Sequence, residues 1–274
     1  MDDKEIDKHY GISGILNSIL DGLESSGKDL EELKQNDLAP VDEFHTRGKE
    51  STVELVKLAQ IQPHHKVLDV GCGLGGSARH IAEKYGCSVI GIDLTDEYID
   101  VANKLTELVK LSDKVSFKQG SAIELPFPSN EFDIVWTEHT QMNIAGKEQF
   151  YGEMSRVLKP KGRLVFHDVF FGTAKDPYYP TPWAEYDSIS SLCTQDEARE
   201  AIEKSNLEIS EWNDKSDLSL EFFKEIIKKT ENSGPPPLGF HLLMGKTAKT
   251  KLQNLAQNLE EHRTSVVLGT ALKK

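Results

Sequence analysis

The chemically most informative residues of this chain are two aspartates and the glycines between them. Asp69 is followed closely by Gly71, Gly73 and Gly75, and Asp93 ends the next apolar stretch. Glycine is needed where a backbone adopts unusual dihedral angles or lies against a ligand. A carboxylate at the position of Asp93 is placed to hold the two hydroxyls of a ribose. The carboxylate of Asp69 would repel a pyrophosphate but suits a cationic amino acid. The pattern therefore predicts a ligand with a ribose, an ammonium group and no phosphate.

Alternating strands and helices must position these residues. Apolar runs predict strands near 66–70, 88–92, 115–119, 132–137, 163–169, 207–213 and 265–271. Helices are predicted near 49–59, 77–85, 96–110, 147–157, 194–205 and 241–261. This alternation is typical of parallel strands joined by right-handed crossovers. The predicted fold class is α/β, with a doubly wound, mostly parallel seven-stranded sheet, added N-terminal helices and a small insertion before the last strand.

The chain is expected to divide into two parts. Residues 1–60 form an N-terminal helical segment that covers the predicted site, with an apolar repeat at helical spacing made by Ile12, Ile15, Leu16, Ile19, Leu20 and Leu23. Residues 61–274 form the main domain, with an insertion near 214–240 that includes a helix at Leu220–Lys229. Pro40–Gly48 is expected to be a loop. The triple proline in Gly234–Gly239 breaks helices and strands, and predicts a rigid loop near the mouth of the site or a plain connector.

The stretch Asp69–Gly75, together with Asp93, resembles the cofactor-binding motif of class I S-adenosylmethionine-dependent methyltransferases. Leu125–Trp136 and Glu153–Val165 resemble the segments that lead into that family's fourth and fifth strands. The resemblance covers about residues 64–170. It implies a Rossmann-like methyltransferase fold, with S-adenosylmethionine as the cofactor and S-adenosylhomocysteine as the product.

The resemblance also implies which residues bind the cofactor. Gly71 and Gly73 would line its methionine end, Asp93 would bind the ribose hydroxyls and Leu94 would flank the adenine. Ser121 stands where the family often has an acid, and its hydroxyl still accepts a hydrogen bond but brings no charge. The predicted set comprises Asp69, Gly71, Cys72, Gly73, Asp93, Leu94, Ser121, Ala122, Ile123 and Thr137.

A narrower resemblance concerns the methyl acceptor. His139–Ile144, Gly239–Gly245 and Asn254–Leu259 resemble the sarcosine/dimethylglycine N-methyltransferases, which make glycine betaine. This implies methyl transfer to the nitrogen of a small amino acid by in-line displacement at the sulfonium, a reaction that requires no metal. Two alternatives stay open. One is a methyltransferase of another small acceptor, such as phosphoethanolamine, a phenol or a sterol. The other is a cofactor-binding partner without catalytic activity.

The attacking amine must lose its proton or be selected in its neutral form. His139, Glu138 and His45 are the candidate proton acceptors, although a histidine in such a loop can also bond only to the backbone. Asp168 is a candidate for holding the substrate amine, or it caps the following turn. An acid beside the amine can equally orient the ammonium group.

The remaining substrate contacts are predicted from charge and aromaticity. A substrate carboxylate needs a cation or several donors, for which Arg47, Gln141 and Asn143 are candidates. Arg47 is equally a candidate for the carboxylate of the cofactor. A quaternary ammonium product suits aromatic walls such as Tyr178, Tyr179 and Trp183. The alternatives are a surface salt bridge for Arg47 and a loop that packs on its own aromatics. The predicted catalytic residues are His139, Glu138, Asp168, Arg47 and Tyr178.

Composition narrows the function classes. The formal net charge of −13 argues against a nucleic-acid substrate, whose phosphates need a basic face. The cysteines, Cys72, Cys87 and Cys193, have no metal-ligand spacing and predict reduced thiols in a cytoplasmic protein. No apolar run approaches the roughly 20 residues of a membrane span, and the acidic start lacks a secretion pattern. We expect no metal, no membrane partner and a monomer or homodimer.

Overall fold

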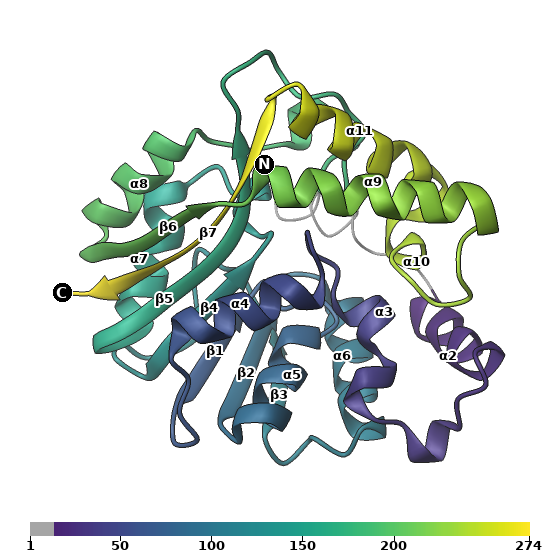
Figure 1. Cartoon of the computed structure of the whole chain (residues 1–274). Coiled ribbons are helices and arrows are strands. Elements are labelled where there is room, and N and C mark those ends of the chain that lie inside the picture. The colour runs from purple at the N-terminus through teal and green to yellow at the C-terminus, as the bar shows by residue number, and fades with distance from the viewer. Residues whose placement is uncertain (1–13) are drawn as a thin grey trace.

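A seven-stranded sheet forms the centre of the molecule in the computed structural model, which describes residues 14–274 (Figure 1). The strand order is β3-β2-β1-β4-β5-β7-β6. The strands are β1 (Lys66–Val70), β2 (Ser88–Asp93), β3 (Val115–Gln119), β4 (Phe132–Glu138), β5 (Leu158–Phe171), β6 (Leu207–Asp214) and β7 (Thr264–Lys273). The strands β1 to β5 pair in parallel, and β7 is antiparallel to both β5 and β6. The predicted fold class is confirmed.

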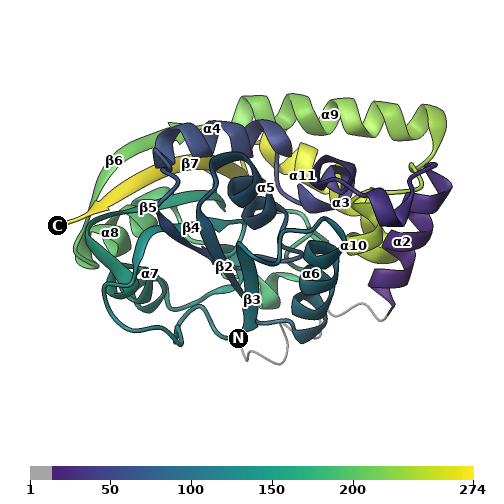
Figure 2. The same cartoon turned by 90° about the horizontal axis from the view of Figure 1, so that it is seen from below.

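Helices cover both faces of this sheet (Figures 1 and 2). On one face, α4 (Lys49–Ala59), α5 (Gly76–Tyr85) and α6 (Asp96–Leu108) pack in one apolar cluster with Val67 of β1. On the other face, α7 (Lys147–Val157) and α8 (Gln195–Lys204) pack in a second cluster with Leu68. Successive side chains of a strand point to opposite faces, so Val67 and Leu68 serve different layers. This two-sided burial explains the apolar character of β1.

The strand order reverses at β1, which lies between β2 and β4. Ligands of doubly wound sheets bind in the crevice beyond the carboxyl ends of the strands at such a reversal. In the sheet register, Asp69 pairs with Gly91 of β2 and with Trp136 of β4. The two predicted cofactor aspartates and the end of β4 therefore meet at one edge of the sheet.

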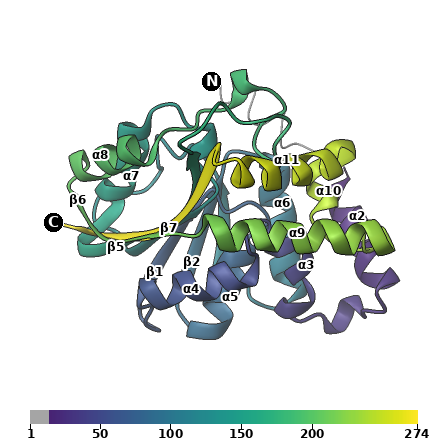
Figure 3. The same ribbon diagram turned by 45° about the horizontal axis from the view of Figure 1, so that its top comes forward.

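A second group of helices, here called the cap, flanks the edge where the carboxyl ends of the strands lie (Figures 1 and 3). It consists of α2 (Ile15–Ser25), α3 (Ala39–Asp42), α9 (Ser216–Ser233), α10 (His241–Met244) and α11 (Ala248–Glu260). The α9 helix packs along α11, and α10 contacts both α11 and α2. Short 3-10 turns lie at Leu30–Glu32, Gln35–Asp37, Gln141–Asn143, Asp187–Ile189 and Gly245–Thr247.

The structure corrects several predicted boundaries. The expected loop Pro40–Gly48 begins inside α3, because proline is tolerated in the first turn of a helix. The single helix expected over 241–261 is broken at Gly245, whose φ of 66° lies in the left-handed region. The insertion helix is longer than expected and spans α9. Ile12 of the N-terminal repeat lies outside the described residues. Within residues 14–274, no helix is long and apolar enough to span a membrane.

Candidate functional site

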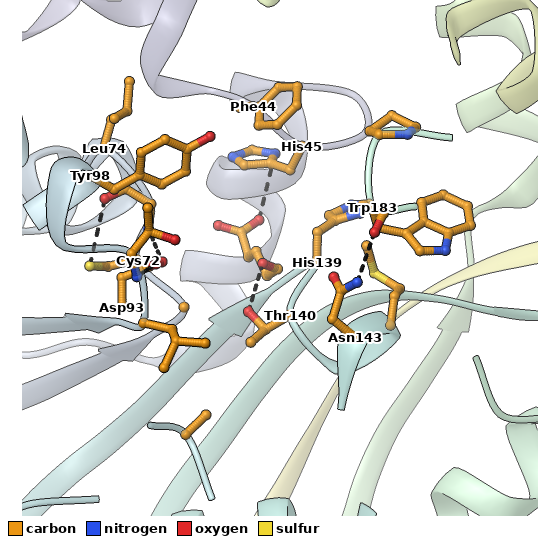
Figure 4. Close-up of a pocket in the computed structure, with 18 of the residues that line it drawn as sticks. Phe44, His45, Cys72, Leu74, Asp93, Tyr98, His139, Thr140, Asn143 and Trp183 are labelled. Atoms are coloured by element: carbon orange, nitrogen blue, oxygen red, sulfur yellow. Dashed lines mark hydrogen bonds and ion pairs between the residues drawn. The ribbon is translucent and has the colours of Figure 1, made fainter. Parts of the chain in front are cut away.

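A cavity of about 410 Å³ opens at the carboxyl ends of β1, β2 and β4 (Figure 4). One end is formed by the glycine loop and by the residues after β2, including Cys72, Asp93 and Tyr98. The other end is formed by the loop after β4 and by Trp183. Cap residues complete the wall, so the cavity lies between the sheet and the cap.

The glycine loop leaves space for a ligand. Gly71, Gly73 and Gly75 have φ values of 74°, 52° and 81°, a region that side chains other than glycine rarely adopt. A Cβ on Gly71 would lie 2.1 Å from Oγ1 of Thr140, so this position is also sterically closed. A Cβ on Gly73 would meet no atom of the described chain within 4 Å. Gly73 therefore borders the open cavity.

Asp93 both supports the loop and faces the cavity. Its Oδ2 accepts a hydrogen bond from the backbone N–H of Gly73 at 2.9 Å, and its Oδ1 accepts one from Thr95 at 3.0 Å. Burial raises the pKa of Asp93, although these backbone hydrogen bonds act in the opposite direction. Each carboxylate oxygen has a second lone pair. The group is therefore suited to accept hydrogen bonds from ribose hydroxyls.

Asp69 is a buried acid that needs a partner. It lines the cavity at 3% exposure, and its Oδ2 has no hydrogen-bond partner among residues 14–274. Burial, together with the charges of Glu138 and Asp93, raises the pKa of Asp69 well above its usual value. A buried carboxylate is costly unless a cation or donors satisfy it. The ammonium group of the predicted cofactor would do so.

Five other residues that were predicted to bind the cofactor belong to the lining of the cavity. Cys72, Leu94, Ser121, Ala122 and Ile123 line the cavity. The prediction for Thr137 is corrected. Its side chain is fully buried within β4, is not part of the lining and has an Oγ1 without a partner in the described chain.

A buried cluster of ionisable side chains surrounds Glu138 at the end of β4. Oε2 of Glu138 accepts hydrogen bonds from Oγ of Ser77 at 2.6 Å and from Nε1 of Trp136 at 2.9 Å. Its Oε1 lies 3.4 Å from Nδ1 of His167 and 3.7 Å from Nδ1 of His45. Burial opposes ionisation, but His45, His167 and Ser77 outweigh it and hold the pKa of Glu138 far below its usual value. Glu138 is therefore ionised.

His45 supplies the positive charge of this cluster. Its Nε2 lies 3.1 Å from Oε2 of Glu43, on the side opposite Glu138. Burial alone would lower the pKa of His45, but the carboxylates of Glu138 and Glu43 outweigh burial and raise it to about 9. His45 is thus an imidazolium between two acids at neutral pH.

His139 lies beside this cluster and lines the cavity. Burial and the neighbouring His167 and His45 lower its pKa well below 6.5, so its ring is neutral at pH 7. Its Nε2 is 3.2 Å from the backbone N–H of Thr46, which donates to it. The lone pair of Nε2 is therefore occupied, and Nδ1 carries the proton. In this arrangement His139 is a hydrogen-bond donor rather than the predicted proton acceptor.

Several predicted substrate residues lie away from the cavity. Arg47 is paired with Glu54 at 2.9 Å, which corrects its assignment to a substrate carboxylate. Tyr178 is 36% exposed and bonds to Glu261, with the guanidinium of Arg263 over its ring. This pairing corrects its assignment to the substrate wall.

Asp168 lies outside the cavity, and two of the predicted hydrogen-bond donors, Gln141 and Asn143, donate to backbone carbonyls instead. Asp168 is 1% exposed, does not line the cavity, and burial raises its pKa well above the usual value. This corrects its assignment as a charged group that holds an amine. Gln141 donates to the carbonyl of Val169 at 2.5 Å. Asn143 lines the cavity, but its amide donates to the carbonyl of Trp183 at 2.8 Å. Tyr179 lies outside the lining, whereas Trp183 belongs to it.

The acceptor end of the cavity has an apolar wall, of which only Trp183 was assigned to the substrate from the sequence. It is called the apolar wall here and consists of Phe44, Met142, Val169, Pro182, Trp183, Phe223, Phe240, Leu243, Met244, Leu252 and Leu255. Five of these eleven residues come from the cap helices α9, α10 and α11. Met142, Leu243 and Leu255 lie in the segments that resemble the sarcosine/dimethylglycine N-methyltransferases. The apolar periodicity of the helices between 216 and 260 was a weaker signal, because it also fits ordinary packing.

Comparison with known proteins is consistent with this site. Residues 68–166 match the family described as "Methyltransferase domain". The match runs from within β1 to within β5 and includes the glycine loop and Asp93. The chain therefore contains a class I S-adenosylmethionine-dependent methyltransferase domain.

Individual relatives differ in their methyl acceptors. The chain is 44% identical over 99 residues to a probable tocopherol O-methyltransferase of Oryza sativa subsp. japonica, covering 36% of this chain and 27% of that protein. It is 30% identical to the methyltransferase GfsG of Streptomyces halstedii, over 66% of each chain. It is 25% identical to a glycine/sarcosine/dimethylglycine N-methyltransferase of Actinopolyspora halophila, covering 73% of this chain and 36% of that protein. The chain thus spans from about a quarter to about two thirds of the length of these relatives.

Solved structures share the fold at low identity. The [4+2]-cyclase SpnF has a TM-score of 0.73 at 19% identity, covering 100% of this chain and 97% of that chain. A putative sarcosine dimethylglycine methyltransferase from Galdieria sulphuraria has a TM-score of 0.68 at 18% identity, covering 82% of this chain and 84% of that chain. One of these two is named as a cyclase, so the fold by itself does not define the reaction.

Proposed function

We propose that this protein transfers the methyl group of S-adenosylmethionine to a small, uncharged acceptor with a largely apolar body. The observation that carries this proposal is the charge of the cavity lining. Within residues 14–274, no lysine or arginine lines the cavity, whereas Asp42, Asp69, Asp93 and Glu138 do. Acids suit a sulfonium cofactor. The imidazolium of His45 also lines the cavity, but it already lies between Glu43 and Glu138, so an acceptor carboxylate or phosphate would have to compete with these two acids for it.

The cavity also supports a mechanism based on positioning. The sulfonium makes the methyl carbon electrophilic, so the site must hold nucleophile, methyl carbon and sulfur in line. Such orientation contributes up to roughly 7–11 kcal/mol in favourable cases. The apolar wall would hold the body of the acceptor, and the Nδ1–H of His139 is available to donate to an acceptor oxygen. The ionised Glu138 lines the same cavity, but its Oε1 faces Nδ1 of His167 and of His45 and its pKa lies far below the usual value, so it is a weak proton acceptor.

The sequence-based alternative is methyl transfer to the nitrogen of sarcosine or dimethylglycine. The relatives named for glycine, sarcosine and dimethylglycine favour it, and the acids of the lining would suit a cationic amine. The pairing of Arg47 with Glu54 counts against it, because the predicted partner of the amino-acid carboxylate is already engaged. Phosphoethanolamine meets the same difficulty with its phosphate.

A transfer assay separates these acceptors. The protein is incubated with methyl-labelled S-adenosylmethionine and one acceptor at a time: a substituted hydroquinone, a simple phenol, a sterol, sarcosine, dimethylglycine or phosphoethanolamine. We expect label in a neutral apolar acceptor and none in the anionic ones. Transfer to sarcosine or dimethylglycine alone would overturn the proposal and would support N-methylation of a small amino acid. Cofactor binding without transfer to any acceptor would overturn it in favour of a non-catalytic partner.

A further inference from the structure

Three side chains beside the cavity have the chemistry and spacing of metal ligands. They are His45, Glu138 and His167, and one ligand atom from each lies within 4.8 Å of the other two. Their side chains are 6%, 6% and 0% exposed. We propose that His45, Glu138 and His167 bind one divalent transition-metal ion, with zinc as the best-fitting choice.

The sheet itself places two of the ligands side by side. Glu138 of β4 and His167 of β5 are direct partners in the parallel register. Adjacent registered residues project to the same face of a sheet, so Oε1 of Glu138 lies 3.4 Å from Nδ1 of His167. The third ligand, His45, comes from the segment after α3 and contributes Nδ1 at 3.7 Å from the same oxygen.

These separations match those around a small ion. Zinc lies about 2.0–2.1 Å from nitrogen and oxygen ligands, which gives a ligand-to-ligand edge of about 3.4 Å in a tetrahedron. The distances from Oε1 of Glu138 to Nδ1 of His167 and to Nδ1 of His45 are 3.4 and 3.7 Å. Two histidines and one carboxylate form a donor set used by catalytic zinc and by other divalent transition metals.

The surrounding contacts orient two of the three ligands, His45 and Glu138, as a metal site requires. A metal-binding histidine commonly donates a hydrogen bond from its second ring nitrogen to a carboxylate, and this bond fixes the orientation of the ring. Nε2 of His45 faces Oε2 of Glu43 at 3.1 Å in this manner. Oε2 of Glu138 is held by Ser77 and Trp136, which leaves Oε1 directed at the two histidines.

A bound ion would replace the proton on Nδ1 of His45. Nδ1 of His45 lies 3.1 Å from Oγ of Ser51 and 3.7 Å from Oε1 of Glu138. A ligating imidazole must be neutral, so the ion takes the place of the proton on that nitrogen. His167 has a second nitrogen, Nε2, for which the described chain offers no hydrogen-bond partner.

Three protein ligands leave at least one position of the ion open. His45 and Glu138 line the cavity, whereas His167 lies behind them. The open position would therefore take a water or an oxygen of the acceptor. This last role rests on the proposed function, but ion binding itself does not.

Metal binding is tested on the whole chain without any acceptor. The purified protein is stripped with EDTA, dialysed against Zn²⁺ and analysed for metal content and affinity. We expect about one tightly held ion per chain, a rise in Tm with Zn²⁺ and, with Co²⁺, visible absorption typical of a four- or five-coordinate site. Loss of a ligand in Glu138→Gln should abolish all three signals. Glu43→Gln should weaken binding by about 10–100-fold, the usual effect of removing a partner of a metal-bound histidine.

A matched control distinguishes this site from adventitious binding. His64 and His65 are adjacent histidines with ring centroids 4.8 Å apart, and His64 is exposed. The double variant His64→Gln/His65→Gln should retain the ion. Loss of the ion in this control, or its full retention in both Glu138→Gln and Glu43→Gln, would overturn the proposal. Because no acceptor is present, failure here leaves the proposed methyl transfer untouched.

Discussion

At the scale of single residues, Asp93 should contribute most of the affinity for the ribose. Its carboxylate lines the cavity and is fixed by the N–H groups of Gly73 and Thr95. A hydrogen bond to a charged group contributes about 1.5–3 kcal/mol. Asp93→Ala should therefore weaken binding of S-adenosylhomocysteine by roughly 10–100-fold, measured by isothermal titration calorimetry.

Ser121 provides the comparison for this variant. It lines the same cavity, but it brings no charge. Ser121→Ala should change the affinity by much less than Asp93→Ala does. Equal losses in the two variants would mean that the ribose contact is not the dominant one.

The three cysteines should be unreactive in the folded protein. Burial raises the pKa of Cys87 and of Cys193 to about 11, and burial with the nearby Asp93 and Asp69 raises that of Cys72 still more clearly. Only the thiolate reacts with a disulfide reagent, so a raised pKa lowers the reactive fraction at pH 8. We expect slow modification by a chromogenic disulfide at pH 8, and rapid modification of all three thiols after unfolding in urea. Fast reaction of the native protein at pH 8 would contradict this.

The position of Asp69, Gly71 and Gly73 at the cavity was predictable from sequence because a local motif carries them. Asp69, Gly71 and Gly73 follow one another on a strand and its loop. The cluster around Glu138 was not predictable to the same degree, because its members come from three elements. The register of β4 and β5 brings His167 to Glu138, and no sequence spacing encodes that contact. Arg47 was misassigned because residue type alone could not show its pairing with Glu54.

At the scale of elements, the break between α10 and α11 depends on Gly245. Its φ is 66° and its ψ is −155°, a combination essentially restricted to glycine. An added Cβ would meet no atom of the described chain within 4 Å, so only backbone strain opposes a side chain there. Gly245→Ala should lower the free energy of unfolding by about 1–3 kcal/mol, measured by urea denaturation.

Gly152 is the matched control for this substitution. It lies inside α7, and its Cβ would also meet no atom of the described chain within 4 Å. Gly152→Ala should raise the free energy of unfolding by up to about 1 kcal/mol, because alanine favours a helix. The same sign of change in both variants would show that the left-handed conformation is not what the Gly245 site requires.

The elements themselves were predictable to different degrees. The central strands have long apolar runs between turn residues, and the structure agrees with their predicted positions within a few residues. β5 begins at Leu158, earlier than expected, because its first residues are polar. The cap was harder to predict, since its helices carry apolar residues for two purposes. Some pack against neighbouring helices, and others, such as Leu243 and Leu255, face the cavity.

At the scale of the whole molecule, the cofactor should couple the sheet to the cap. Gly73 and Asp93 lie on the sheet side of the cavity, and Phe44 and Leu243 lie on the cap side. Ligand at about 100 times its Kd adds about 2.7 kcal/mol to the stability of the folded state. This should raise Tm by roughly 5–10 °C for a chain of this size, measured by calorimetry with S-adenosylhomocysteine.

Hydrogen exchange locates that stabilisation. Because both the sheet and the cap contribute walls to the cavity, the ligand should slow amide exchange in the glycine loop and also in residues 241–247 of the cap. The α8 helix packs in the apolar cluster on the opposite face from α5 and contributes no residue to this cavity, so it reports only the global change. Protection of the glycine loop with 241–247 behaving like α8 would mean that the cofactor binds the sheet alone. The cap would then serve only the acceptor, and its order would depend on the second substrate rather than on the first.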